Sequence, residues 1–314
     1  MSIALVFPGQ GSQTVGMLGE LAAAFPVVKQ TFDEASTALG RDLWQVVQQG
    51  PAEELNRTEC TQPAMLTAGM ATWRVWKQLG GADPAQVSGH SLGEFTALAC
   101  AEAIAFPDAV ALVRDRGSYM QQAVAAGEGA MAAILGLDNA DVEAACGEAA
   151  EGAVVEAVNF NSPGQVVIAG ERAAVERAIV AAKARGAKRA MLLPVSVPAH
   201  SSLMRPAAER LRERLGSVRI GAPRFRYVSA VDAKAHADPE ELRQLLVRQL
   251  ASPVRWTGTV QALCAGGATQ IAECGPGKVL TALNRRIERR PDLRCSALED
   301  EASIRAAIAP EAGS

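Results

Sequence analysis

The sequence predicts an α/β protein with a mostly parallel sheet, into which a smaller ferredoxin-like α+β subdomain is inserted. Residues 130–193 follow the order strand, helix, strand, strand, helix, strand, which is the ferredoxin-like pattern. On both sides of this stretch, short apolar runs typical of buried strands alternate with helical patterns, as expected of an α/β domain. A strand, a sharp turn and a helix also follow one another around Ser91. We therefore expect a discontinuous larger domain, residues 1–126 and 196–310, and a subdomain, residues 127–195.

The first part of the larger domain opens with a buried strand, because Ile3–Phe7 is a short apolar run. Apolar residues at helical spacing then predict helices at residues 16–24, 27–39, 43–49, 63–79 and 107–124. Thr61 is expected to cap the fourth of these helices. Between the last two lie a short strand at 85–88 and a helix at 92–101, separated by a glycine-rich turn.

The rest of the chain divides into the subdomain and the second part of the larger domain. In the subdomain we expect strands at 130–135, 154–158, 165–169 and 189–193, and helices at 140–150 and 173–185. The polar run Asn159–Gly164 is expected to form a turn. Residues 195–200 read as extended and end on a histidine. Beyond them we expect helices at 203–215, 239–250, 256–265, 278–288 and 304–308, and strands at 225–231 and 270–273.

Composition and charge exclude several classes of function. The chain has 314 residues and a net charge of −3, so we expect no general affinity for nucleic acid or anionic membranes. No apolar run approaches the ~20 residues that span a bilayer. The first residues lack the basic region of a signal peptide, so we expect a cytoplasmic protein. Six scattered cysteines without a Cys-x-x-Cys pair favour neither a disulfide framework nor a metal site.

Gly89-His-Ser-Leu-Gly93 has the Gly-x-Ser-x-Gly spacing of a nucleophile elbow. In such an elbow a sharp turn between a strand and a helix exposes the serine oxygen at the positive end of the helix. There, backbone N–H groups can stabilise an oxyanion. The alternative is a glycine-rich turn with an incidental serine, but the strand and helix on either side favour the elbow and make Ser91 the candidate nucleophile.

A serine nucleophile needs a general base, which is most often a histidine. The chain has three histidines, at positions 90, 200 and 236. His90 adjoins Ser91 and is expected to be structural, while His236 is expected to lie in a solvated loop. His200 ends an extended segment, where strand ends often present catalytic groups, and is therefore the candidate base. Spacing alone assigns no acid that would complete a triad.

Gln10 lies in the turn after the first strand, and such turns meet at the carboxyl edge of an open α/β sheet. Its backbone N–H, together with that of Leu92, could form an oxyanion hole; the alternative is a tight Gly-Gln-Gly turn with no such role. Gly9-x-Gly11 does not continue as a dinucleotide-binding loop, because the third glycine is out of register.

One single arginine and one cluster of four arginines are candidates for contacts with anions. Arg116 falls on the apolar stripe of the helix at 107–124, where a guanidinium is costly unless it is paired. Its partner could be an internal carboxylate or a ligand. Arg285, Arg286, Arg289 and Arg290 cluster near the end of the helix at 278–288. This arginine cluster could compensate the helix dipole on a wet face, or it could dock an acidic partner.

The motifs together resemble those of the malonyl-CoA:acyl-carrier-protein transacylases of fatty acid synthesis, in the same order and over nearly all of the chain. They are Phe7-Pro-Gly-Gln-Gly-Ser-Gln13, Gly89-His-Ser-Leu-Gly-Glu94, Arg114-Asp-Arg-Gly117, Asn159-Phe-Asn-Ser-Pro-Gly-Gln165, Pro194-Val-Ser-Val-Pro-Ala-His200 and Gly275-Pro-Gly277. The resemblance implies a hydrolase-like α/β acyltransferase domain with a ferredoxin-like insert, which agrees with the pattern of elements.

The resemblance also implies a role for individual residues. Ser91 would be the nucleophile and His200 its base, working as a dyad without an acid. The oxyanion hole would be formed by the N–H groups of Gln10 and Leu92. Arg116 would bind the malonyl carboxylate through a bidentate pair.

Two further positions match the family less directly. The backbone carbonyl of Gln249 would orient the histidine, and Asn161 would lie near the pantetheine arm of the thioester. Family members often have Pro-Ser-His where this chain has Pro-Ala-His, ending at His200. The base is retained, while the case for a local hydrogen bond from the middle residue is weaker.

The function implied is transfer of the malonyl group from malonyl-CoA to the phosphopantetheine thiol of acyl carrier protein, through a malonyl-serine intermediate. We expect a monomer that needs no metal or redox cofactor and whose partners are malonyl-CoA and acidic acyl carrier protein. The alternatives are a malonyltransferase that serves a polyketide synthase or a malonate decarboxylase carrier, an acyl thioesterase, and an inactive scaffold that binds the carrier. Intact Ser91, His200 and Arg116 argue against the scaffold.

Overall fold

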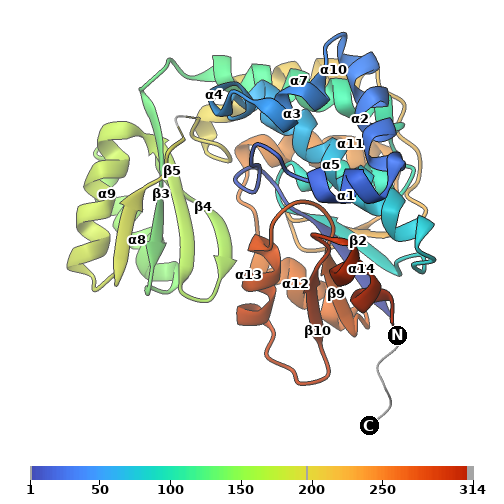
Figure 1. Ribbon diagram of the computed structural model, residues 1–314. Helices are drawn as coiled ribbons and strands as arrows, with labels where there is room; N and C mark the ends of the chain where they lie inside the picture. The colour runs from blue at the N-terminus through green and yellow to red at the C-terminus, as the bar shows by residue number, and fades with distance from the viewer. Residues whose placement is uncertain (1, 196, 310–314) are drawn as a thin grey trace.

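The computed structural model describes residues 2–195 and 197–309, and it confirms the predicted fold class (Figure 1). The larger domain contains a six-stranded sheet in the order β10-β9-β1-β2-β7-β8. Its strands are β1 (Ile3–Phe7), β2 (Gln86–Gly89), β7 (Arg226–Val228), β8 (Ala235–His236), β9 (Gln270–Glu273) and β10 (Arg294–Ala297). Neighbouring strands pair parallel except β7 and β8, which pair antiparallel.

Helices cover both faces of this sheet. They are α1 (Gly19–Ala24), α2 (Pro26–Leu39), α3 (Leu43–Gln49), α4 (Ala52–Leu55), α5 (Thr58–Gln78), α6 (Gly93–Cys100), α7 (Phe106–Ala123), α10 (Arg205–Leu215), α11 (Pro239–Arg248), α12 (Trp256–Ala265), α13 (Val279–Ile287) and α14 (Glu301–Ile308). Leu5 and Phe7 of β1 belong to the core with α2, α5 and α7, whereas Ala4 and Val6 pack with α12 and α13. Because both faces of β1 are buried, its sequence is an unbroken apolar run.

The subdomain contains a four-stranded sheet in the order β4-β5-β3-β6, on the left of Figure 1. The elements of the subdomain are β3 (Gly129–Leu135), α8 (Asn139–Ala150), β4 (Val155–Ser162), β5 (Gln165–Glu171), α9 (Arg172–Ala184) and β6 (Arg189–Leu192). This order and the antiparallel pairing are those of a ferredoxin-like fold. The division at residues 127–195 stays a prediction, and three bounding residues of the larger domain, Met1, Ser196 and Pro310, lie outside the described residues.

The expected turn at Asn159–Gly164 was largely wrong. Asn159 to Ser162 continue β4, with irregular register against β5, and only residues 163–164 form the hairpin tip. These polar residues remain in a strand because its backbone also pairs with the larger domain. The Phe160 N–H donates to the Val254 carbonyl at 2.9 Å, and the Val254 N–H donates to the Val158 carbonyl at 2.8 Å.

The expected start of α5 was also wrong. The helix begins at Thr58, so Pro63 lies inside it, and Thr61 is not its cap. Instead, the Thr61 hydroxyl donates to the Leu55 carbonyl at 2.5 Å. Almost the whole of α5 is buried, and this packing outweighs the local cost of the proline.

Three short elements were not predicted. They are α4, β8 and β10, which have four, two and four residues. The predicted strand at 225–231 shortens to Arg226–Val228. Among the described residues, no helix is long and apolar enough to cross a membrane.

Candidate active site

Ser91 lies in a strained turn between β2 and α6, with a backbone φ of 54°. Gly89 and Gly93, on either side of Ser91, allow the backbone to pack against neighbouring backbone atoms with no room for a side chain. A Cβ atom on Gly89 would lie 1.9 Å from the Gly93 carbonyl carbon, and one on Gly93 would lie 2.0 Å from the Phe7 carbonyl oxygen. The Gly-x-Ser-x-Gly motif thus has a steric cause here, and the turn has the geometry of a nucleophile elbow.

His200 lies against Ser91, although the two residues are 109 positions apart. Its Nε2 atom is 2.7 Å from the Ser91 Oγ atom, and its Nδ1 atom is 2.8 Å from the backbone carbonyl of Gln249. A carbonyl can only accept a hydrogen bond, so Nδ1 carries the ring proton and Nε2 is free to accept the serine proton. The Leu250 carbonyl accepts the His200 backbone N–H at 3.0 Å and further fixes the residue.

The environment of His200 keeps the imidazole neutral. Burial lowers its pKa from 6.5 to about 3, and the positive charge of Arg116 acts in the same direction. The hydrogen bond to Gln249 opposes these effects. A histidine that is neutral near pH 7 has a free lone pair, which is the state that a general base requires.

Arg116 is fully buried beside this pair. Its Nη2 atom donates to the Ser91 Oγ atom at 3.3 Å and to the side chain of Gln249 at 2.8 Å, and its Nη1 atom donates to Gln62 at 2.9 Å. The Nε atom has no hydrogen-bond partner among the described residues. Burial lowers the pKa of Arg116 to about 10, partly offset by Glu94, so the guanidinium stays charged at pH 7. In the described chain its hydrogen-bond acceptors are two amide oxygens and the serine oxygen, with no carboxylate among them, which leaves a buried cation facing Ser91.

Gln10 and Leu92 lie at the ends of adjacent strands, because Gln10 follows β1 and Leu92 follows β2. Their backbone N–H groups donate to no acceptor in residues 2–195 and 197–309. The side-chain oxygen of Gln10 accepts from Gln62 at 3.3 Å. Two backbone donors without a partner in the described residues thus lie at the carboxyl edge of the parallel strands, next to the candidate nucleophile.

His90 and Asn161 join the two domains beside the elbow. The His90 Nε2 atom is 2.9 Å from the Asn161 Oδ1 atom, and its ring packs against Trp256 with centroids 5.6 Å apart. Asn161 comes from β4 of the subdomain, so that side chain reaches the edge of the elbow.

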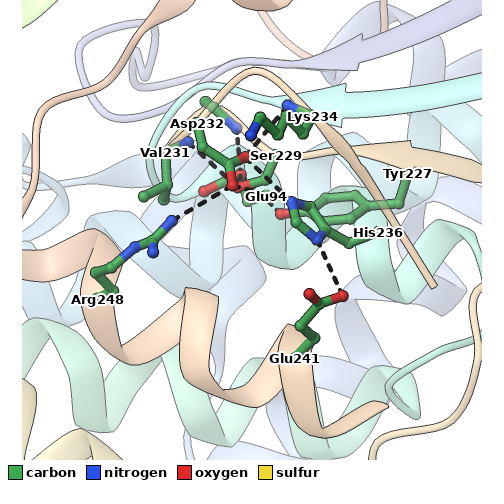
Figure 2. A network of polar contacts seen from close by, with 10 residues as sticks. Glu94, Tyr227, Ser229, Val231, Asp232, Lys234, His236, Glu241 and Arg248 are labelled. Carbon is green, nitrogen blue, oxygen red and sulfur yellow. Dashed lines mark hydrogen bonds and ion pairs between the residues drawn. The ribbon is translucent and has the colours of Figure 1, made fainter. Parts of the chain in front are cut away.

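The third histidine and the arginine cluster lie on other elements. His236 is not in a solvated loop as expected: it belongs to β8, its side chain is 10% exposed, and it is 3.1 Å from carboxylate oxygens of both Asp232 and Glu241 (Figure 2). The four arginines of the cluster are exposed around the end of α13, where Arg286 donates to Gln165 of β5 at 2.9 Å.

Gln62 and Glu94 were not identified from the sequence. Gln62 lies on buried α5 and binds Arg116. Glu94 is 1% exposed in the first turn of α6, and burial raises its pKa above the ordinary value while several hydrogen-bond donors lower it. The signal available was a glutamate within a run of small apolar residues, three positions after the nucleophile. Its partners come from β7 and from the chain after α11, which no local pattern reveals.

Comparison with known proteins gives consistent matches over nearly the full length of the chain. Residues 4–303 match the model of the acyl transferase domain family. The malonyl CoA-acyl carrier protein transacylase of Escherichia coli K12 is 57% identical over 97% of this chain and 98% of its own length. The malonyl CoA-acyl carrier protein transacylase of Bacillus subtilis is 44% identical over 98% of this chain and 96% of its own length.

Solved structures agree with the sequence matches. The malonyl CoA-acyl carrier protein transacylase of Coxiella burnetii superposes with a TM-score of 0.96 at 47% identity, covering 98% of this chain and 97% of that one. A malonyl-transacylase solved in complex with a type II polyketide synthase acyl-carrier protein has a TM-score of 0.96 at 55% identity. The match covers 98% of this chain and 99% of that one.

Proposed function

Because this chain belongs to the acyl transferase domain family, we propose that it transfers the malonyl group from malonyl-CoA to the phosphopantetheine thiol of acyl carrier protein. The transfer serves fatty acid synthesis. The observation that carries the proposal is a buried, charged Arg116 within hydrogen-bond distance of a Ser91–His200 pair. This arrangement selects an acyl group that carries its own negative charge.

In the first half-reaction the Ser91 Oγ atom attacks the thioester carbonyl, and its proton moves to the Nε2 atom of His200. A C–O ester bond forms and the C–S bond breaks. The proton on His200 then passes to the departing CoA sulfur. The free Nε2 lone pair and the 2.7 Å contact support this role for His200. The backbone carbonyl of Gln249 would stabilise the imidazolium that forms between the two steps.

The negative charge on the carbonyl oxygen would be held by the N–H groups of Gln10 and Leu92. Each preorganised donor of this kind contributes on the order of 10²–10³ in rate in serine enzymes. The Leu92 N–H lies at the start of α6, so the helix dipole acts in the same direction.

In the second half-reaction the phosphopantetheine thiol of the carrier takes the place of CoA. Its proton moves to His200, the sulfur attacks the malonyl-serine ester, and Ser91 leaves with the proton returned by His200. We propose that Asn161, at the junction with the subdomain, lies along the pantetheine arm, since it reaches the edge of the elbow through His90.

Arg116 favours transfer over the thioesterase alternative. The guanidinium has unused donors and no carboxylate partner in the described chain, and a malonyl carboxylate would supply one. A general acyl thioesterase has no use for a buried cation next to its nucleophile. We further propose a cytoplasmic monomer, as expected from the sequence.

Intact-mass spectrometry tests the proposed function. The protein should gain the mass of one malonyl group on mixing with malonyl-CoA, and lose it when phosphopantetheinylated acyl carrier protein is added and becomes malonylated. The Ser91→Ala variant should fold and gain nothing. Loss of the adduct to water, with the carrier unmodified, would mean hydrolysis and would contradict the proposal.

A polyketide synthase carrier is a second candidate recipient, because one similar transacylase was solved with such a carrier. The same measurement with a fatty acid carrier and a polyketide carrier side by side distinguishes the two by their rates of malonylation. A malonate decarboxylase carrier can be added as a third recipient.

A further inference from the structure

Glu94 is a buried carboxylate that the proposed chemistry does not use. It lies in the first turn of α6, and Figure 2 shows it beside Tyr227 and Ser229. Within residues 2–195 and 197–309, Glu94 has hydrogen-bond donors but no direct cationic partner. Such a carboxylate needs another reason to be in the fold, since its desolvation is costly.

In the part of the chain that the structure describes, four hydrogen-bond donors contact Glu94, and together they reach both of its oxygens. The Oε1 atom accepts from the Tyr227 hydroxyl at 2.7 Å, the Ser229 hydroxyl at 2.9 Å and the Ala230 backbone N–H at 2.6 Å. The Oε2 atom accepts from the side-chain amide of Gln249. The site thus requires an acceptor at both ends, which a carboxylate provides and a glutamine side chain does not.

The side-chain amide of Gln249 connects this carboxylate to the catalytic elbow. Its Nε2 atom donates to Glu94 and also to the Ser91 backbone carbonyl at 2.9 Å. Its Oε1 atom accepts from the Arg116 Nη2 atom at 2.8 Å. The Ser91 carbonyl accepts one N–H of the Gln249 amide and Glu94 accepts the other, so the Gln249 Oε1 atom faces Arg116.

We propose that Glu94 is a positioning residue for substrate selection: through the Gln249 side chain it holds the Arg116 guanidinium where the free carboxylate of a malonyl group can pair with it. This inference rests on the proposed function. The role of the Gln249 side chain is separate from that of its backbone carbonyl, which contacts His200.

The Glu94→Gln substitution disturbs this relay with little change in volume. One orientation of the new amide places its N–H₂ group against the N–H₂ group of Gln249. The other places it against the Ala230 N–H. The three donors at the Oε1 position favour the first orientation, in which the Gln249 side chain has to turn or move and the Arg116 Nη2 atom loses the Gln249 oxygen as an acceptor. The group that selects malonyl is then displaced, while Ser91 and His200 stay in place.

The test compares the acylation kcat/KM for malonyl-CoA with that for acetyl-CoA, using the full-length protein. Glu94→Gln should lower the malonyl-to-acetyl ratio by at least about tenfold, equivalent to about 1.4 kcal/mol, with the acetyl rate retained. Tyr227→Phe is the matched control, because it removes a donor from the other carboxylate oxygen. It should lower the melting temperature and leave the ratio unchanged.

A second variant decides the question if Glu94→Gln does not fold. Gln249→Ala keeps the backbone carbonyl that contacts His200 and removes the relay, so it should lower the ratio by a similar factor. In the Gln249→Ala background, Glu94→Gln should change the ratio no further.

Two results would overturn the inference. One is an unchanged ratio in Gln249→Ala. The other is a parallel loss of both substrates in Glu94→Gln, which would make Glu94 purely structural. With an active wild-type protein these results leave the proposed function standing, whereas a wild-type protein that takes no malonyl group would refute both.

Discussion

At the scale of single residues, the environment of His200 decides how the protein responds to pH. A histidine with its ordinary pKa would be half protonated near pH 6.5, and the protonated ring cannot accept the serine proton. Burial and Arg116 lower the pKa of His200 to about 3. The neutral form therefore persists as the pH falls, because the folded-state pKa lies below the ordinary one.

We accordingly expect the rate of malonyl-enzyme formation to stay nearly constant from about pH 7 to about pH 5. Rapid-quench mass spectrometry on the first turnover measures this rate directly. His236→Ala should give the same profile, because His236 contacts Asp232 and Glu241 rather than Ser91. A rate that halves near pH 6.5 would show that His200 is not held neutral.

Arg116 should determine which acyl group is accepted. An acetyl group would leave the guanidinium buried and unpaired, and a broken buried pair costs ~3–5 kcal/mol. This cost corresponds to roughly two to four powers of ten in discrimination. Arg116→Ala should therefore lose malonyl transfer steeply and keep or gain acetyl transfer. Arg116→Lys should recover little, since an ammonium group lacks the planar fork of a guanidinium.

Rates for malonyl-CoA and acetyl-CoA, measured together with melting temperature, check this prediction. If Arg116→Ala melts early and loses both substrates in parallel, the arginine is an internal structural cation and does not bind the carboxylate.

The positions of Ser91, His200 and Arg116 were predictable because each follows from a local pattern. Ser91 has its glycines, His200 ends an extended segment, and Arg116 falls on an apolar helix stripe. Gln62 and Glu94 were not predicted because their roles depend on distant hydrogen-bond partners. Gln62 binds Arg116, 54 positions away, and Glu94 binds Gln249, 155 positions away. A sequence shows that a polar residue is buried more readily than it shows which partner satisfies it.

At the scale of secondary-structure elements, the elbow depends on close contact between β1, β2 and α6. Gly93→Ala would place a Cβ atom 2.0 Å from the Phe7 carbonyl oxygen. This oxygen belongs to the backbone and, unlike a side-chain atom, cannot relieve the clash by changing rotamer. We expect a loss of about 3 kcal/mol or more in the free energy of unfolding, since β1 and α6 have to separate.

Gly147 provides the matched control, because it lies inside α8 and, apart from its neighbours and the nearby helix backbone, no atom lies within 4 Å of a Cβ at that position. Gly147→Ala should stabilise the protein by ~0.5–1 kcal/mol. Urea denaturation of both variants gives the two values. A Gly93→Ala protein as stable as the wild type would mean that the glycine is not required by packing.

Several elements with a clear apolar pattern were predicted to within a residue or two, whereas the starts of α1 and α14 and the end of β7 were each three residues off, and short polar elements were missed. α3 and β9 have the predicted bounds. β10 has the sequence Arg-Cys-Ser-Ala at the edge of the sheet, half-buried, and offers no apolar run to recognise. The start of α5 was misplaced because tertiary packing, rather than local propensity, determines it.

At the scale of the whole molecule, the insertion of one domain into the other was readable from the order of elements, but the order of strands in the larger sheet was not. β1 lies between β2 and β9, which are separated by most of the chain. The site forms where these distant segments meet, with β4 of the subdomain at its edge. The arginine cluster lies at the same junction, since Arg286 contacts Gln165.

This location suggests that the arginine cluster guides the acidic carrier to the site, although the chain as a whole has a net charge of −3. Electrostatic steering acts mainly on the rate of encounter and weakens with salt. Arg289→Glu should therefore raise the KM for acyl carrier protein several-fold and flatten its salt dependence, with malonyl-CoA acylation unchanged.

Arg219→Glu changes the net charge equally at an exposed position after α10, an element that packs against α7 and α11. It should leave the carrier KM and its salt dependence near those of the wild type. Measuring both half-reactions separately at two salt concentrations distinguishes docking from other roles. If Arg289→Glu impairs acylation by malonyl-CoA as much as transfer to the carrier, the cluster binds a group common to both substrates. If both reversals raise the carrier KM equally, total charge rather than this surface is responsible.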